Sequence, residues 1–150
     1  MQALETAIVD RISNSSDLPV QVAVLPWSDK PLKVSVPSGN TAAILVRFAG
    51  VQLQVSATPN RGRLVQSGQL EVETRFFVKT LREGNGAYDL MFFVQRVLSN
   101  FLPTALELNY SANLPGLQLV DCQLIGNDKT IWDWGQTYTL PITYTQRSLN

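Results

Sequence analysis

The spacing of hydrophobic residues predicts two amphipathic helices in this chain. Near the start, Leu4, Ile8 and Ile12 recur at every fourth position and so share one face of a helix. Between Leu90 and Phe101, apolar residues recur again with the helical period, and Pro103 shortly after them cannot continue a helix. We therefore expect an N-terminal helix over Met1–Ser13 and a central helix over Ala87–Leu102.

Elsewhere hydrophobic residues alternate with polar ones, which is the pattern of β-strands. The longest alternations cover Gln69–Arg82 and Ile131–Gln146. Within the second, Pro141 has no N–H to donate and predicts a sheet edge or a bulge. Thr58–Gly68 contains a proline and two glycines and is expected to be a mobile loop. The other predicted strands are Val20–Leu25, Thr41–Phe48, Val51–Ala57 (separate or a continuation) and Leu117–Ile125, with weaker extended pieces at Leu32–Val36 and Leu106–Tyr110.

The order of these elements is a helix, several strands, a second helix and a closing β-hairpin. Helices that are not interleaved one per strand indicate an α+β fold, here a mainly antiparallel sheet with both helices packed on it. No internal repeat or change in composition marks a second domain, so we expect residues 1–150 to form a single domain.

The composition excludes several kinds of chemistry. The chain has no histidine and one cysteine, Cys122, so it lacks the usual zinc ligand sets and the base of Ser-His-Asp and Cys-His catalysis. An internal disulfide is also excluded. We expect no cofactor and no metal. With 12 basic and 12 acidic residues, the formal net charge of zero gives no overall field that attracts nucleic acid or acidic lipid.

The chain carries no segment typical of secretion or membrane insertion. The N-terminal residues lack a basic start, and the longest apolar run, Ala42–Val46, is far shorter than the roughly 20 residues that cross a bilayer. We expect a soluble protein made in a reducing compartment, most simply the cytoplasm. Charged residues make up only 16% of the chain, and uncharged polar surface costs less to bury, which favours assembly.

Two clusters are compatible with chemistry, although a structural role is favoured for each. The glycine-rich segment 84–86 precedes a helix and could hold an anion, but it has no Walker lysine, so a turn with a helix cap is favoured. Asp121, Asp128 and Asp133 could bind a metal or share a proton. Their spacing follows no known loop, and solvated acids are favoured.

Two pairs of side chains are candidate contact sites. Trp132 and Trp134 point to the same face of a regular strand, where they either anchor a partner or pack inside the hairpin, and both interpretations stay open. Arg61 and Arg63 lie in the predicted loop and could meet phosphate or acidic groups, although a solvated loop tip is favoured.

Three short segments occur in an order that is found in a known family. They are "LVRFAG" at residues 45–50, "GAYDL" at the opening of the central helix, and a closing strand of the form "W…Y.L.I.Y". Together with the order of the elements, they resemble the tail terminator (tail completion) proteins of contractile-tailed phages, particularly the group in Mu-like prophages. The resemblance covers nearly the whole chain.

The resemblance implies a structural virion protein of the tail and neck, made in the host cytoplasm, rather than an enzyme. Such subunits form a hexameric ring at the head-proximal end of the tail tube. The ring ends tube growth, meets the last sheath ring and offers a docking face to the neck or connector protein, while DNA passes through without sequence-specific binding. No catalytic residues carry over. We expect contacts in the closing hairpin and the loop, at Arg61, Arg63, Trp132, Trp134 and Tyr138.

Two alternatives stay open. Another ring component of the same machine, such as a head–tail connector (stopper), a tube protein or a sheath-initiating protein, would show the same general features. A small α+β enzyme or ligand-binding domain would instead use the carboxylates of Asp121, Asp128 and Asp133.

Overall fold

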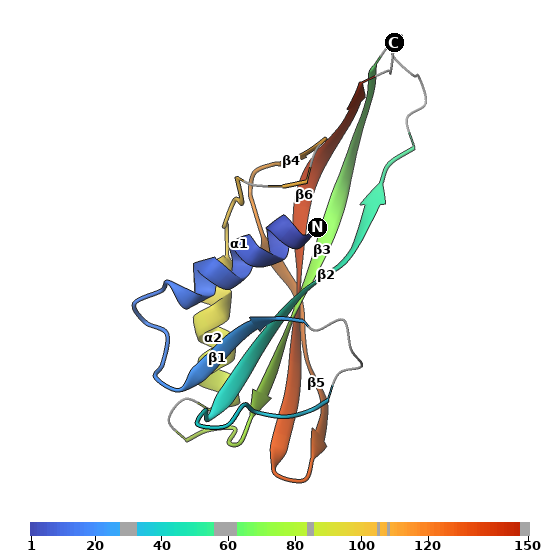
Figure 1. The fold of residues 1–150 in the computed structure, drawn as a ribbon. Helices are drawn as coiled ribbons and strands as arrows, with labels where there is room; N and C mark the ends of the chain where they lie inside the picture. The colour runs from blue at the N-terminus through green and yellow to red at the C-terminus, as the bar shows by residue number, and fades with distance from the viewer. Residues whose placement is uncertain (28–32, 56–62, 84–85, 105, 108, 148–150) are drawn as a thin grey trace.

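The computed structural model of the chain describes residues 1–27, 33–55, 63–83, 86–104, 106–107 and 109–147. Within them the chain forms two helices and one curled, mostly antiparallel sheet of six strands, which confirms the predicted α+β fold (Figure 1). The elements are α1 (Gln2–Ser13), β1 (Val22–Pro26), β2 (Ala42–Leu53), β3 (Arg63–Val78), α2 (Ala87–Leu98), β4 (Tyr110–Ala112), β5 (Gln118–Asp128) and β6 (Ile131–Arg147).

The closing strand β6 is the centre of the sheet. It pairs antiparallel with β3 along its whole length. On its other side it pairs with β5 near its start and with β4 near its end, so the predicted closing hairpin is present as β5–β6. β2 pairs antiparallel with β3, and β1 lies parallel to β2. Among the described residues, β1 is therefore one edge of the sheet, and β5 and β4 form the other. Figure 1 shows β3 and β6 running on together as a long twisted ribbon beyond the helices.

The core lies between the sheet and the two helices. On α1 the buried side chains are Leu4, Ile8 and Ile12, as the four-residue spacing predicts. On the strands every second residue faces the helices. One row of cross-strand neighbours on this face runs from β1 to β5 and consists of Val24, Ile44, Phe76, Trp134 and Leu124.

β3 begins earlier than the sequence predicts. Residues 63–68, expected to belong to a loop, extend the strand and pair with the end of β6. The proline and glycines of the expected loop, Thr58–Gly68, predict a turn, but hydrogen-bonded pairing with the distant strand β6 outweighs this local preference. Gly68 faces β2, where a Cβ atom would collide with the carbonyl oxygen of Gln52. The glycine therefore permits a close approach of two strands and does not form a turn.

β1 and β2 also differ in detail from the prediction. β1 starts at Val22 instead of Val20, because Gln21 has a positive φ of 64° and interrupts the extended backbone. The stretch after Gly50 continues the preceding strand through a bulge, so it is not a separate strand.

The central helix ends four residues before its predicted limit. α2 stops at Leu98, where the Ser99 hydroxyl donates to the carbonyl oxygen of Gln95 at 2.7 Å. Asn100 then takes a positive φ of 62°, which turns the chain away from the helix axis. The apolar periodicity continues beyond this point because Phe101 still packs against the core from the loop.

The two weak extended pieces are mostly not strands. Residues 33–36 form no strand, and Leu32 lies outside the described residues. In the second piece, Leu106–Tyr110, Leu108 lies outside the described residues, and of the other four only Tyr110 belongs to a strand, as the first residue of β4.

Pro141 lies inside the sheet and not at its edge. Asn113 N–H donates to the Pro141 carbonyl oxygen at 2.8 Å, so the backbone of Pro141 faces β4 and β5. On that side the pairing with β5 ends at Thr139 and the pairing with β4 begins at Ile142. The missing N–H therefore falls where β6 changes partner, which corrects the predicted sheet edge.

Candidate functional site

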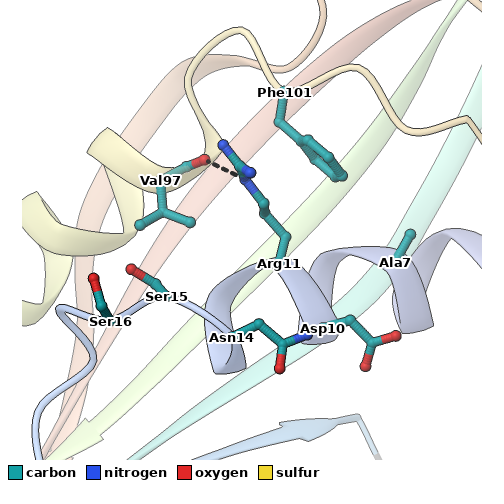
Figure 2. Close-up of a pocket in the computed structure, with 8 residues that line it drawn as sticks. All are labelled: Ala7, Asp10, Arg11, Asn14, Ser15, Ser16, Val97 and Phe101. Atoms are coloured by element: carbon teal, nitrogen blue, oxygen red, sulfur yellow. Dashed lines mark hydrogen bonds between the residues drawn. The ribbon is translucent and has the colours of Figure 1, made fainter.

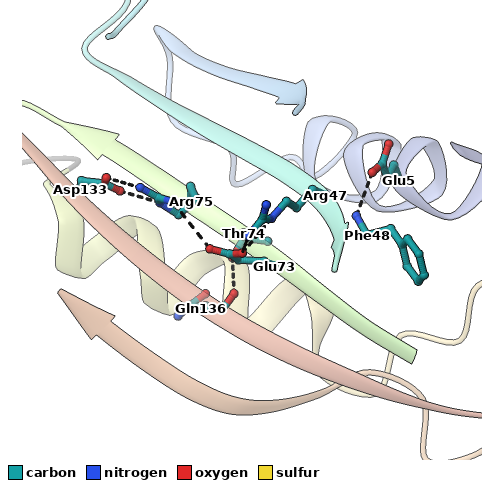
Figure 3. A network of polar contacts seen from close by, with 8 residues as sticks. All are labelled: Glu5, Arg47, Phe48, Glu73, Thr74, Arg75, Asp133 and Gln136. Carbon is teal, nitrogen blue, oxygen red and sulfur yellow. Dashed lines mark hydrogen bonds and ion pairs between the residues drawn. The ribbon is translucent and has the colours of Figure 1, made fainter. Parts of the chain in front are cut away.

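A network of charged side chains crosses the sheet on the face opposite the helices (Figure 3). Arg75 Nε donates to Asp133 Oδ1 at 2.7 Å, and Arg75 Nη2 donates to the second oxygen of the same carboxylate. Glu73 Oε2 accepts a hydrogen bond of 2.9 Å from Arg47 Nε, and the other carboxylate oxygen, Glu73 Oε1, lies 3.8 Å from Arg75 Nη1. The network therefore ties together β2, β3 and β6.

The indole of Trp27 covers this network. Its ring centroid lies 4.1 Å from the guanidinium carbon of Arg47 and 5.2 Å from that of Arg75, which are cation–π distances. Asp133 is only 4% exposed, so its bidentate pair with Arg75 is largely withdrawn from water. Because each carboxylate is engaged by a guanidinium group, the arrangement holds strands together and offers no unpaired acid for chemistry.

The three aspartates considered as a catalytic or metal site do not converge. Asp133 is paired with Arg75, whereas Asp121 and Asp128 are exposed on β5. In the sheet Asp133 lies opposite Gly126, and Gly126 is five residues from Asp121 along β5, which is about 16 Å in an extended strand. Among the residues that the structure describes, no group of three His, Cys, Asp or Glu side chains could hold a metal ion.

The start of α2 is closed by the chain itself. Gly86 is the N-cap residue, and the first helical N–H groups, of Ala87 and Tyr88, donate to the carbonyl oxygens of Thr80 and Leu81 at 2.9 and 3.3 Å. Of the segment 84–86, residues 84 and 85 lie outside the described residues. These bonds favour the turn and helix cap over an anion site.

A surface hollow of about 490 Å³ lies between α1, the turn after it and the end of α2 (Figure 2). Arg11 points into it, and its Nε donates to the carbonyl oxygen of Val97 at 3.4 Å. The Arg11 guanidinium carbon also lies 5.2 Å from the ring centroid of Phe101. Arg11 therefore fastens α1 to the chain around the end of α2, and the hollow holds no pairing of a nucleophile with a base.

Trp132 and Trp134 lie on the helix-facing side of β6 and are partly buried against the core. The rings of Trp134 and Tyr88 meet edge to face, with centroids 5.8 Å apart. Of the two interpretations left open, packing against the core of the chain describes both indoles, although neither is fully buried. Within the described residues no acceptor lies within hydrogen-bond distance of Trp134 Nε1.

Tyr138 is fully buried, with 0% of its surface exposed, so its side chain is not on the surface as the interface prediction required. Its position on β6 directs the ring toward the helices, and its hydroxyl donates to Gln136 Oε1 at 2.9 Å. Burial raises the pKa of the Tyr138 phenol well above its ordinary value of 10.0. Tyr138 therefore belongs to the hydrophobic core of the chain.

Of the two arginines predicted as contact residues, the structure describes the backbone of Arg63 alone. Arg61 lies outside the described residues. Arg63 is the first residue of β3 and pairs with Arg147, the last residue of β6. Its backbone therefore lies at the far end of the long ribbon.

Contacts are predicted in the closing hairpin, but they include no residue of β5, whose surface is exposed. Val120, Leu124 and Ile125 are 56%, 47% and 43% exposed. They project from a strand that, among the described residues, pairs with β6 alone. The apolar pair Leu124-Ile125 was a signal for this, because neighbouring residues of a strand point to opposite faces and only one face is covered by helices.

Cys122 lies in the middle of β5. Taken over the whole residue Cys122 is exposed, but its sulfur atom points toward the helices and lies 3.6 Å from the sulfur atom of Met91 on α2. Burial raises the pKa of the Cys122 thiol, which disfavours the reactive thiolate at neutral pH. The thiol therefore has the features of a packing residue.

No helix among the described residues has the length and apolar content needed to span a membrane. Comparison with protein-family models finds none that matches the chain, and comparison with curated proteins finds no match either.

Proposed function

We propose that this chain is the tail terminator subunit of a contractile phage tail or a related injection machine. Six copies form a ring that caps the head-proximal end of the tail tube. The ring ends growth of tube and sheath and docks to the neck protein. It is a structural component of the virion tail and neck, made in the host cytoplasm.

The exposed edge strand β5 is the observation that carries the proposal. Edge strands of soluble proteins are usually protected by charges, prolines or covering segments. The stretch Cys122–Gly126 of β5 contains no charge and no proline, and its aliphatic side chains are half exposed. Such an edge is suited to contact with another protein subunit. A ring is formed by head-to-tail contacts between unlike surfaces of identical subunits, closed by rotation.

The charge balance supports the same role. A ring through which DNA slides must not hold the phosphate backbone strongly, because each phosphate contact adds to the affinity. The formal net charge of zero fits that requirement. The proposed partners are therefore further copies of the chain, the tube protein, the sheath protein and the neck protein, with DNA passing unread through the channel.

The alternatives are supported to different degrees. A head–tail connector or another ring component would use the same exposed edge, and only its place in the particle separates it from a terminator. An enzyme that uses Asp121, Asp128 and Asp133 together is not supported, because Asp121 lies five residues along β5 from the position opposite Asp133, and Asp133 is paired with Arg75.

Substitution at the β5 edge tests the proposal. Leu124→Lys places a charge at the contact and should convert the hexamer to a monomer in sedimentation velocity. Val65→Lys is the matched control, because Val65 is also aliphatic, lies on a strand and is 43% exposed, but on the distant ribbon. It should leave the hexamer intact. Identical sedimentation of the wild type and Leu124→Lys would count against β5 as the contact that forms the ring.

A further inference from the structure

We propose that the ring is closed by backbone pairing between the outer edge of β5 in one copy and the outer edge of β1 in the next. The inference rests on the proposed ring and adds to it the identity of the two contacting strands. It makes the six sheets one continuous sheet around the channel.

Strand directions are compatible with this pairing. β1 and β2 run the same way, β3 runs against them, β6 runs with them, and β5 runs against β6. The two edges of the sheet therefore run in opposite directions. A second copy placed beside the first, with its helices on the same side, brings β1 antiparallel to β5. Antiparallel pairing is the commoner and slightly more stable arrangement.

The two edges also lie at the same height in the sheet. The row of cross-strand neighbours that starts at Leu25 on β1 passes through Leu45, Arg75 and Gly135 and ends at Gln123 on β5. Closure of a ring requires rotation without a rise along the axis. Edges at equal height meet this requirement when the strands run along the ring axis.

The β1 edge has backbone groups available for pairing. Trp27 N–H donates to Val46 on β2, and the Gln21 carbonyl accepts from Thr41 at the start of β2. Alternate residues of a strand direct their backbone groups to opposite sides, so Val22 and Val24 direct theirs away from β2. No partner for these groups occurs in the described part of the chain.

β1 and the middle of β5 carry none of the charges that usually prevent such pairing, and the acidic residues of β5, Asp121 and Asp128, flank that stretch. β1 consists of Val22-Ala23-Val24-Leu25-Pro26, and Leu25 at its outer end is 43% exposed. The central stretch of β5 is also uncharged and half exposed. Lysine and other inward-pointing charges are the common protection of edge strands. An uncharged stretch on each of the two edges of one sheet favours a second copy as the occupant.

Chemical cross-linking tests the pairing. In a Cys122→Ser background, Leu25→Cys and Gln123→Cys are introduced together and treated with a short bis-maleimide. Both positions lie on the sheet face opposite the helices and in the same row. We expect a covalent ladder from dimer to hexamer. Either single cysteine variant should give only monomer, because a head-to-tail contact never brings two identical residues together.

Other outcomes overturn the inference in separable ways. A hexamer by light scattering without cross-linking in the double variant would reject the β1–β5 pairing and leave the ring intact. A dimer cross-linked through Gln123→Cys alone would show two-fold β5–β5 pairing, which excludes the head-to-tail contact. A monomer at all concentrations would reject both the pairing and the ring.

Hydrogen exchange gives a second test that needs no cysteine. In the assembled wild type, the amides of Val22 and Val24 should exchange more slowly than in the monomeric Leu124→Lys variant. Equal exchange rates in the two proteins would reject backbone pairing at β1.

Discussion

The buried ion pair between Arg75 and Asp133 is the most sensitive contact of the polar network. Asp133→Ala would leave the largely buried Arg75 guanidinium without its partner. We expect the free energy of unfolding to fall by about 3 kcal/mol. Urea denaturation followed by circular dichroism measures this change. Asp121→Ala on the exposed surface of β5 is the control and should change stability by less than about 0.5 kcal/mol. Equal effects of the two variants would show that the pair does not stabilise the fold.

Tyr138 gives the protein a specific dependence on high pH. Burial raises the pKa of its phenol in the folded state above the ordinary 10.0, so the unfolded chain releases this proton first. The free energy of unfolding therefore keeps this contribution below about pH 10 and loses it as the pH rises further, by up to about 1.4 kcal/mol per pH unit.

Tyr138→Phe should reduce that slope between pH 10 and the denaturation limit, as measured by urea titrations at several alkaline pH values. At neutral pH the variant lacks the hydrogen bond to Gln136, and its free energy of unfolding should be lower by about 1 kcal/mol. Parallel curves for variant and wild type across the alkaline range would contradict a buried, protonated Tyr138.

At the scale of elements, the close approach of β2 and β3 depends on Gly68. A Cβ at this position meets the backbone of Gln52 and the side chain of Leu53, so Gly68→Ala requires the strands to separate. We expect a loss of roughly 1–3 kcal/mol, the usual cost of overpacking. Gly50→Ala is the matched control, because it lies in the neighbouring strand β2 and no atom lies within 4 Å of its added Cβ. Thermal unfolding should distinguish the two variants, and the same midpoint for both would show that the strands do not meet closely at Gly68.

The elements were predictable where local pattern and tertiary packing agree. The helical spacing of Leu4, Ile8 and Ile12 gave the buried face of α1, and alternation gave most of β3, β5 and β6. The start of β3 was not predictable, since its pairing with the end of β6 is decided by residues about 80 positions away. The end of α2 depends on the positive φ angle of Asn100, and the spacing of apolar residues does not predict a backbone angle.

The candidate site was predictable only in part, because sequence does not show which surfaces stay uncovered. Trp132, Trp134 and Tyr138 were predicted as contact residues of the closing hairpin, but the direction of β6 turns all three toward the core. The exposed aliphatic residues of β5 are conspicuous only once the structure shows that α2 reaches Cys122 while Val120, Leu124 and Ile125 stay exposed. Asp133 was considered as a free acid, and its pairing with Arg75 appears only in the sheet register.

At the scale of the whole molecule, the sheet has one uncharged edge strand, β1, a second edge strand, β5, whose middle is uncharged, and a long ribbon that extends beyond the helices (Figure 1). A monomer leaves these surfaces in water, whereas a ring covers both edges in one type of contact. Six copies of a 16.6 kDa chain make a particle of about 100 kDa.

Electron microscopy of the concentrated wild-type protein tests the central claim most directly. The account predicts class averages of a six-fold ring with an open central channel, which are lost in Leu124→Lys and retained in Val65→Lys. Particles that remain single subunits, or that form closed two-fold dimers, would contradict it.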